Sequence, residues 1–259
     1  MSARLLSEQI DATLVLTISN PQFRNALGAE IYTAGIEAIN AAESNRDVRS
    51  IIITGEGEHF CAGGNLNRLQ DNRSQAPQVQ EDSIEALHTF IECIRNSPKP
   101  VIAAVEGAAA GAGVSLALAC DMVVAADNAK FVMAYSSVGL SPDGGGAWVL
   151  ARNLPRATAM HMLLSAAPMT ATALHQLGVV SQLAQPGNAL GQALNSAATI
   201  NARAPNVMAS IKELMNDACD TNFTTHLLAE KKHFVRNLHH ANGAEGISAF
   251  LEKRPPHYK

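Results

Sequence analysis

The chain has 259 residues, of which 47% are hydrophobic, and it carries a formal net charge of −4. This length and composition suit a globular protein with one large domain or one domain and an appendage. The acidic balance argues against nucleic acid and anionic membranes as partners.

The N-terminus and the cysteines predict a cytoplasmic protein. Residues 1–8 contain no apolar signal core. The most membrane-like stretch, residues 107–120, is bounded by Glu106 and Asp121 and falls short of the ~20 apolar residues that a membrane span needs. The four cysteines show no CxxC spacing, which is typical of free thiols in a reducing compartment. The histidines show no HExxH pattern, so we expect no metal site.

Apolar periodicity predicts alternating strands and helices through about residue 185. A hairpin with strands at 5–10 and 13–19 is followed by a loop at 20–25, a helix at 29–44 and a strand at 48–54. Next come a helix at 84–96, a strand at 101–105, a helix at 111–119 and a strand at 122–126. Helices at 147–154, 158–164 and 170–177, the last capped by Thr170, precede a strand at 179–183. This alternation predicts an α/β core.

From residue 189 onward the chain shows only helical patterns. Residues 227–238 carry an apolar stripe with charged residues off it. These helices could pack on their own core or on another subunit, and the sequence leaves both possibilities open. We therefore expect a core at 1–195 and a helical C-terminal part at 196–259.

Two glycine-rich segments lie about fifty residues apart, at 60–66 (FCAGGNL) and 107–113 (GAAAGAG). Each follows a β-branched apolar run and is predicted to leave a buried strand and enter a helix. Glycine and alanine leave backbone N–H groups uncovered, and two such groups aimed at one point would hold a developing oxyanion. The alternative interpretation is tight packing of strand on helix.

An ordered series of motifs over nearly the whole chain resembles the crotonase (enoyl-CoA hydratase/isomerase) superfamily. The motifs are Asn20-Pro21, RNAL at 24–27, IIITGEG at 51–57, FCAGGNL at 60–66, KPVIAAVEG at 99–107, GAG at 111–113, Cys120-Asp121, GLSPDGG at 139–145 and AFLEKR at 249–254. The resemblance implies a spiral of ββα units with a C-terminal helical oligomerisation part, assembled as a homotrimer or a dimer of trimers. It also implies an acyl-CoA thioester as substrate, with coenzyme A part of that substrate and no separate cofactor.

The resemblance assigns the two oxyanion-hole amides to Gly64 and Ala112. Ala112 stands where many members of the superfamily have the middle glycine of a glycine triplet. Its N–H can still act, since the amide and not the side chain makes the contact. A helix that starts near Gly111 would add its positive end.

The chain departs from the hydratases of the superfamily at their two catalytic glutamates. The matching positions hold Ser115 and Tyr135, and neither is an unassisted base near neutral pH, because tyrosine ionises near ~10 and serine higher still. A third position, Asp143, matches the acidic residue of the enoyl-CoA isomerases and of the relatives that act on ring-opened phenylacetyl-CoA intermediates. One carboxylate suffices for isomerisation. The alternative interpretation is a Ser-Pro-Asp-Gly turn in which Asp143 caps the helix near Ala147.

Further residues are implied as contacts to coenzyme A. They are Arg24, Ala26, Ala62, Gly64, Asn65, Leu66 and Arg68 from the two loops, with Phe250 and Lys253 reaching the CoA of a neighbouring subunit. Arginine and lysine suit phosphates. Asn65 replaces the aspartate common at its position, which weakens an inherited role for the side chain but not for the backbone.

The sequence thus predicts an enoyl-CoA isomerase, with a 3-enoyl to 2-enoyl shift or its cyclic counterpart as the reaction. The alternatives are an enoyl-CoA hydratase, a hydrolase or dehalogenase with Asp143 as nucleophile, and a catalytically silent acyl-CoA-binding protein. The identity of the acyl group depends on residues 70–95, which shape the pocket and vary among relatives.

Overall fold

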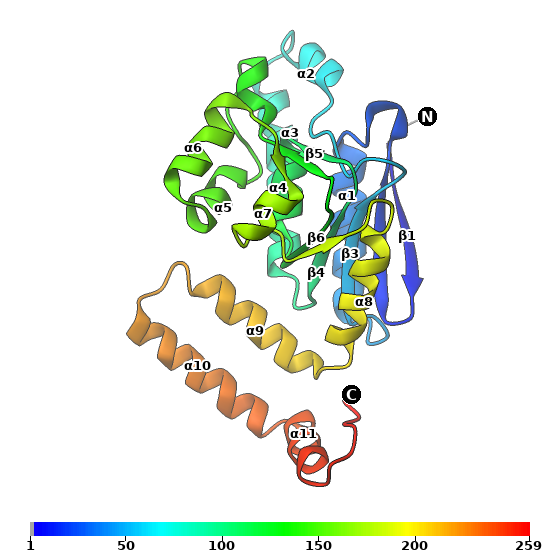
Figure 1. Ribbon diagram of the computed structural model, residues 1–259, viewed down its shortest axis with the longest axis vertical. Helices are drawn as coiled ribbons and strands as arrows, with labels where there is room; N and C mark the ends of the chain where they lie inside the picture. Colours follow the sequence, from blue (N-terminus) through cyan, green and yellow to red (C-terminus); the bar gives the residue numbers. More distant parts are fainter. Residues whose placement is uncertain (1–2) are drawn as a thin grey trace.

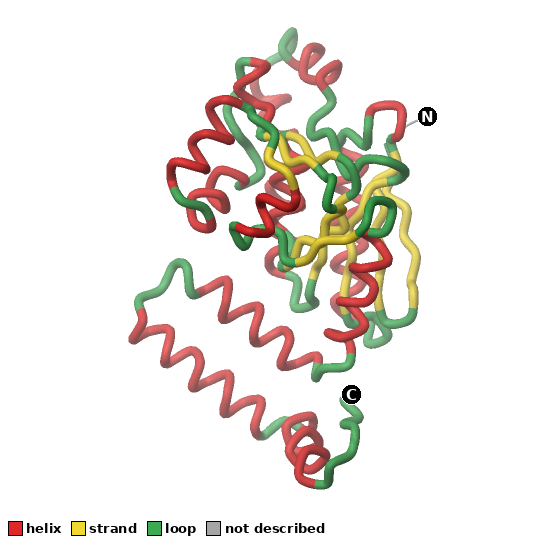
Figure 2. The backbone as a smooth tube through the Cα atoms, viewed as in Figure 1, coloured by secondary structure: helices red, strands yellow, loops and turns green. Residues whose placement is uncertain are grey.

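The computed structural model describes residues 3–259 and contains two sheets surrounded by helices (Figures 1 and 2). The larger sheet has the strand order β1-β2-β3-β4-β6-β9. Its strands are β1 (Arg4–Ile10), β2 (Thr13–Ser19), β3 (Ser50–Gly55), β4 (Val101–Val105), β6 (Met122–Ala126) and β9 (Gln182–Ala184). Only β1 and β2 pair antiparallel, and the remaining neighbours are parallel. The predicted α/β class is therefore confirmed.

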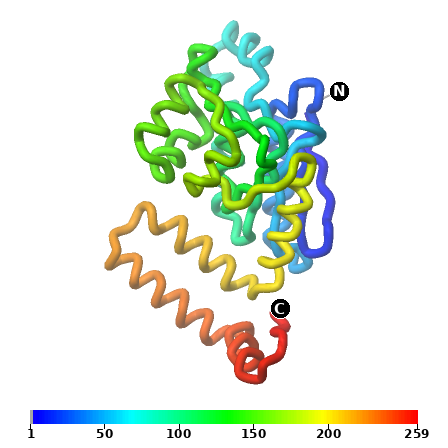
Figure 3. Tube along the Cα trace, in the orientation of Figure 1, coloured from blue at the N-terminus to red at the C-terminus, as the bar shows by residue number. Residues whose placement is uncertain are grey.

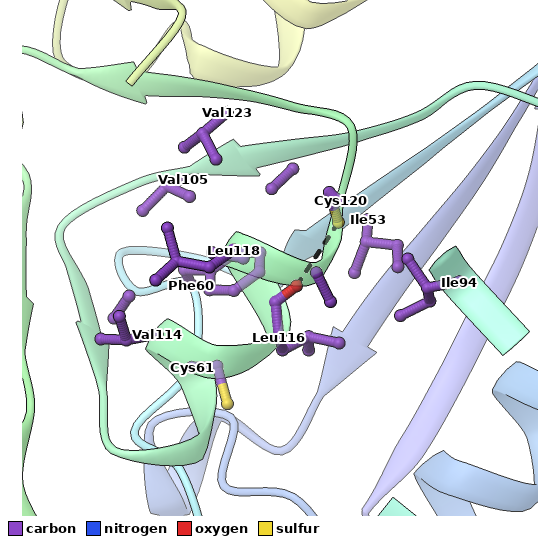
Figure 4. Close-up of a cluster of buried hydrophobic side chains, with 14 of the residues drawn as sticks. Ile53, Phe60, Cys61, Ile94, Val105, Val114, Leu116, Leu118, Cys120 and Val123 are labelled. Atoms are coloured by element: carbon purple, nitrogen blue, oxygen red, sulfur yellow. Dashed lines mark hydrogen bonds between the residues drawn. The ribbon is translucent and has the colours of Figure 1, made fainter. Parts of the chain in front are cut away.

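The central strands β3, β4 and β6 are almost entirely buried, because helices cover both faces of the sheet. Ile51 and Ile53 of β3 pack in one buried cluster, together with side chains of α1 (Ala29–Ser44), α3 (Pro77–Asn96) and α4 (Ala112–Ala119). Ile52, which points to the opposite face, packs with Ala193 and Ala197 of α8 (Ala189–Asn201). Alternating side chains of one strand thus build two separate cores. Figure 4 shows the first of them around α4, which is buried on all sides.

A small second sheet includes part of the second glycine-rich segment. It contains β5 (Ala108–Ala110), β7 (Lys130–Val132) and β8 (Met169–Thr170). These strands of two or three residues are too short to show a periodic pattern, and the sequence did not predict them. The three expected helices are α5 (Gly146–Asn153) and α6 (Arg156–Ser165), which lie between β7 and β8 in the chain, and α7 (Ala171–Gln176), which follows β8 and is capped by Thr170 as predicted.

Two helical segments differ from the sequence prediction. Residues Leu66–Asn72 form α2, the helix that the loop at 60–66 was predicted to enter but whose bounds the sequence did not indicate, and α3 begins at Pro77 instead of residue 84. The buried residues of α3 all lie from Leu87 onward, so its polar first turns carry no apolar stripe. Pro77 at the first helical position favours that start, since its fixed φ suits a helix N-terminus.

The C-terminal helices form an arm below the core (Figures 1 and 3). The helix α8 packs on the sheet and contains the expected boundary at 195–196, whereas α9 (Pro205–Asp217), α10 (Phe223–Leu238) and α11 (Ala241–Leu251) extend away. Within residues 3–259, no helix combines the length and apolar character needed to cross a bilayer.

Lys212 connects this arm to the core through one ion pair and two hydrogen bonds. It is buried on α9, and its Nζ lies 2.8 Å from Asp121 Oδ2 and donates to the carbonyls of Ile94 at 2.9 Å and Lys99 at 3.2 Å. These contacts satisfy all three ammonium protons.

We expect Lys212→Met to lower the free energy of unfolding by roughly 3–5 kcal/mol, because Asp121 and two carbonyls would lose a buried cationic partner. The urea midpoint, followed by circular dichroism, measures the loss. Lys231→Met, at an exposed position of α10, is the matched control and should change the midpoint little. Equal midpoints for the two variants would show that Lys212 does not hold the arm.

Candidate active site

One cavity of about 1160 Å³ lies where α2, α3, the start of α4 and the loop at 139–145 meet. Gly64, Ala112 and Asp143, the three predicted catalytic residues, all line it. Three segments that are far apart in the sequence therefore converge on one site.

The two glycine-rich loops meet beside this cavity. The Cys61 N–H donates to the Ala108 carbonyl at 3.1 Å, and the Ala110 N–H donates to the Cys61 carbonyl at 2.9 Å. A Cβ on Gly113 would lie 2.3 Å from the Cys61 carbonyl oxygen, so only glycine permits this approach. Glycine in these loops thus allows the tight packing of strand on helix that was the alternative interpretation of the motif. Close packing and amide exposure occur together here.

The amides of Gly64 and Ala112 are available to a ligand. Among the hydrogen bonds of residues 3–259, neither N–H has a protein acceptor. A Cβ built on Gly63 would lie 3.1 Å from the Ala112 nitrogen, which places the first loop directly against the start of α4. Gly111 precedes α4 with φ 50° and ψ −124°, a conformation that L residues avoid. The positive end of α4 therefore faces the cavity beside both amides.

Asp143 is fixed by a tyrosine. Its Oδ1 accepts a hydrogen bond from the Tyr135 hydroxyl at 2.6 Å. Burial raises the pKa of Tyr135, and the Asp143 charge and this hydrogen bond raise it further, so Tyr135 remains a protonated donor at neutral pH. Among the residues that line the cavity, all within the described part of the chain, Asp143 is the only carboxylate.

Asp143 does not cap the following helix. The N-cap of α5 is Gly145, and no side chain makes a capping hydrogen bond there. The helix-capping role that the sequence suggested for Asp143 is therefore wrong. Gly145, a left-handed residue with φ 75°, precedes the helix, and the Asp143 carboxylate remains available to the cavity.

Ser115 holds the backbone of the same loop. It is buried in α4, and its hydroxyl donates to the Asp143 carbonyl at 2.9 Å. A Cβ on Gly146 would lie 2.5 Å from Ser115 Oγ, and one on Gly144 would lie 3.0 Å from Ser115 Cβ. Because the loop rests directly on Ser115, this packing has no room for a glutamate at position 115.

His88 is a site residue that the sequence analysis did not identify. It lies on α3, is the only histidine that lines the cavity within the described residues, and its Nε2 accepts a hydrogen bond from the Gly144 N–H at 3.4 Å. Its spacing from Ile84, Leu87 and Ile91 gives the i, i+3, i+4 and i+7 pattern of one helix face. That pattern was a signal that His88 faces inward with these apolar residues.

The residues expected to bind coenzyme A fall into two groups. Ala62, Gly64, Leu66 and Arg68 line the cavity. Arg24 and Ala26 lie just outside the lining, and the Arg24 carbonyl accepts from the Ala62 N–H at 2.9 Å. Their contacts with coenzyme A remain predictions.

Three other expected CoA contacts lie away from the cavity lining. Asn65 caps α2, because its side-chain oxygen accepts hydrogen bonds from the amides of Asn67 at 3.0 Å and Arg68 at 3.4 Å. An uncharged asparagine is therefore sufficient for the capping role at this position. Phe250 is 84% exposed at the end of α11, and Lys253 follows it on the arm. Both would have to act on another subunit, as the resemblance implied.

Fold and site together define a class of protein. The chain belongs to the enoyl-CoA hydratase/isomerase family, that is, the crotonase superfamily, because the Enoyl-CoA hydratase/isomerase family model matches residues 8–259. The chain processes acyl-CoA thioesters within this family.

Individual relatives carry both isomerase and hydratase names. The chain is 34% identical over 255 residues to a 1,2-epoxyphenylacetyl-CoA isomerase of Escherichia coli K12, covering 98% of this chain and 97% of the relative. It is 32% identical over 259 residues to a 2,3-dehydroadipyl-CoA hydratase of the same organism, covering 100% and 99%. The crystal structure of an enoyl-CoA hydratase from Polaromonas sp. JS666 superposes with a TM-score of 0.98 at 62% identity, covering 99% and 100%. The crotonase fold is thereby confirmed.

Proposed function

We propose that the chain is an enoyl-CoA isomerase that moves a double bond in an unsaturated acyl-CoA by proton transfer through Asp143. The observation that carries this proposal is the single carboxylate among the described residues of the cavity lining, held by Tyr135 in the cavity that Gly64 and Ala112 also line. Isomerisation needs one group that removes a proton from one carbon and returns it to another.

The steps follow from these groups. The thioester oxygen accepts from the amides of Gly64 and Ala112, and each donor of this kind contributes roughly 3–4 kcal/mol of transition-state stabilisation. Asp143 removes an allylic proton, and the resulting enolate is held by the two amides. The protonated carboxyl group then returns the proton to the far carbon. Only protein groups and the CoA thioester take part in these steps.

Water addition by the usual two-carboxylate route has less support. Ser115 and Tyr135 both bind Asp143, one at its carbonyl and one at its carboxylate, instead of supplying a second acid. Some relatives are named hydratases, so a panel of acyl-CoA thioesters, straight-chain and cyclic, should be assayed for isomerisation and for water addition. Isomerisation as the dominant activity supports the proposal, and dominant water addition refutes it.

A second candidate reaction is hydrolytic dehalogenation of an aryl-CoA, in which the Asp143 carboxylate attacks the halogen-bearing ring carbon, the halide leaves, an aryl ester forms on Asp143, and water then hydrolyses that ester. His88 favours it, because an ester formed on Asp143 would need a base to activate water, and His88 lies against the adjacent residue at 3.4 Å.

His88→Gln separates the two reactions. Glutamine can still accept the Gly144 N–H bond but cannot act as a base, so isomerase turnover should fall less than about 10-fold. A hydrolase should instead lose roughly 10²–10⁴-fold and accumulate an ester on Asp143, which intact-protein mass spectrometry would detect. The second result would replace the isomerase proposal.

We also propose that the arm assembles the chain into a homotrimer or a dimer of trimers. In the single chain its apolar side chains are exposed, among them Leu227 at 45%, Leu228 at 57% and Phe234 at 70%. Exposed apolar patches of this kind mark interfaces.

Light scattering should accordingly give three or six times the 27.3 kDa chain mass. Phe234→Glu should shift the population toward the monomer, since a charge would be buried in the interface. A monodisperse monomer of the unmodified protein would contradict this assembly.

A further inference from the structure

Arg68 presents an unusual cation to the cavity. It lines the cavity, and its Nε is buried without a hydrogen-bond partner among residues 3–259. It takes part in none of the ion pairs of the described residues. A buried polar group without a partner is unfavourable, so this arrangement favours a ligand that supplies the missing acceptor.

The surroundings of Arg68 also suit an anion. Tyr32 of α1 is 3% exposed and lines the same cavity. Its pKa is raised by burial, and the neighbouring Arg68 partly offsets that rise, so the phenol remains a donor beside the guanidinium. A guanidinium Nη1 lies 3.6 Å from the Cβ position of Gly28, the residue before α1, where no side chain caps the helix. The guanidinium, the phenol and the positive end of α1 are thus three features that attract negative charge.

The position of this cluster distinguishes two anionic ligands. Tyr32 is almost fully buried, and Tyr32, Arg68 and Asp143 all line one cavity, so the cluster lies on the side of the cavity that is enclosed by the core. Phosphates of coenzyme A are strongly hydrated and multiply charged, which suits the exposed rim. A carboxylate with two oxygens in a plane matches the fork of a guanidinium.

We propose that Arg68 and Tyr32 form a subsite for a carboxylate at the far end of the acyl group, so that the substrates are CoA monothioesters of dicarboxylic acids. For Arg68, this subsite replaces the contact with coenzyme A that the resemblance implied. The inference rests on the proposed function only in placing the acyl group in this cavity. Glu30 is the competing carboxylate on this helix. It is exposed, and its Oε2 lies 2.9 Å from the same Cβ position of Gly28 without forming an ion pair with Arg68.

Saturated acyl-CoA pairs test the subsite by binding alone. Succinyl-, glutaryl- and adipyl-CoA are compared by calorimetry with butanoyl-, pentanoyl- and hexanoyl-CoA, and free coenzyme A is measured alongside. None of these ligands can isomerise, so a failure of the isomerase proposal leaves this measurement intact. We expect at least one dicarboxylyl-CoA to bind about 10- to 100-fold more tightly than its uncharged partner, the usual effect of charge-assisted hydrogen bonds.

Arg68→Met should abolish that preference while pentanoyl-CoA and free coenzyme A bind as before, and Tyr32→Phe should reduce it. Arg73→Met is the matched control, because Arg73 lines the same cavity at an exposed position. It should weaken all ligands alike, if it weakens any. Equal affinities within all three pairs in the unmodified protein would overturn the proposal. An equal loss for free coenzyme A and for every thioester in Arg68→Met would also overturn it and assign Arg68 to a phosphate.

Discussion

Asp143→Asn is expected to lower turnover of a 3-enoyl-CoA by roughly 10²–10⁴-fold, the usual contribution of a positioned acid–base group. Asparagine keeps the size of the side chain, and its carbonyl can still accept the Tyr135 hydrogen bond that now measures 2.6 Å. It cannot take up a proton from carbon. The rate of double-bond migration, followed by the absorbance of the conjugated product, measures the loss.

Binding should survive this change, because the Gly64 and Ala112 amides are untouched. Ser115→Ala is the matched control from the same loop contact. It removes the 2.9 Å hydrogen bond to the Asp143 carbonyl but no acid–base group, so it should cost far less than Asp143→Asn. Full activity of Asp143→Asn, with normal affinity for acyl-CoA, would remove Asp143 from the mechanism.

Ala112→Pro should lower turnover by about 10²–10³-fold, because it deletes one of the two oxyanion donors. Proline suits the first position of a helix, and Ala112 is the first residue of α4, so the backbone can accept the change. The relevant measurement is kcat at saturating substrate, together with the melting temperature as a test of folding.

Ala112→Gly is the control for this variant, since it keeps the N–H and removes only a methyl group. Turnover of the glycine variant should stay within a few-fold of the unmodified protein. A folded Ala112→Pro variant that turns over acyl-CoA normally would show that this amide is not a donor to the thioester.

The sequence predicted the elements with strong apolar periodicity correctly. It did not predict the elements whose formation depends on contacts with distant parts of the chain. The strands β3 and β4 and the buried helix α4 followed from unbroken β-branched or small apolar runs. The polar first turns of α3 lack such a run, because they line a cavity instead of packing on a core. A short strand such as β5 exists only because it pairs with β7.

In the site, too, local motifs could be predicted from the sequence, whereas contacts between distant segments could not. The glycine-rich loops and Asp143 were recognisable from local motifs. The hydrogen bond between Tyr135 and Asp143 depends on how the turn at Ala134–Val138 faces the loop at 139–145, which no local pattern records. The loop at 60–66 was predicted to enter a helix, but the position at which α2 begins, and with it the role of Asn65 as the cap, did not follow from the local sequence.

The most direct test of the central claim is the product formed from a 3-enoyl-CoA in deuterated water, identified by mass spectrometry and NMR. Proton transfer by Asp143 predicts the conjugated 2-enoyl-CoA as the main product, with no water added. Deuterium should appear at the receiving carbon to the extent that the Asp143 carboxyl group exchanges with solvent before it returns the proton. A 3-hydroxyacyl-CoA as the dominant product, or no turnover of any unsaturated acyl-CoA that binds, would contradict the account.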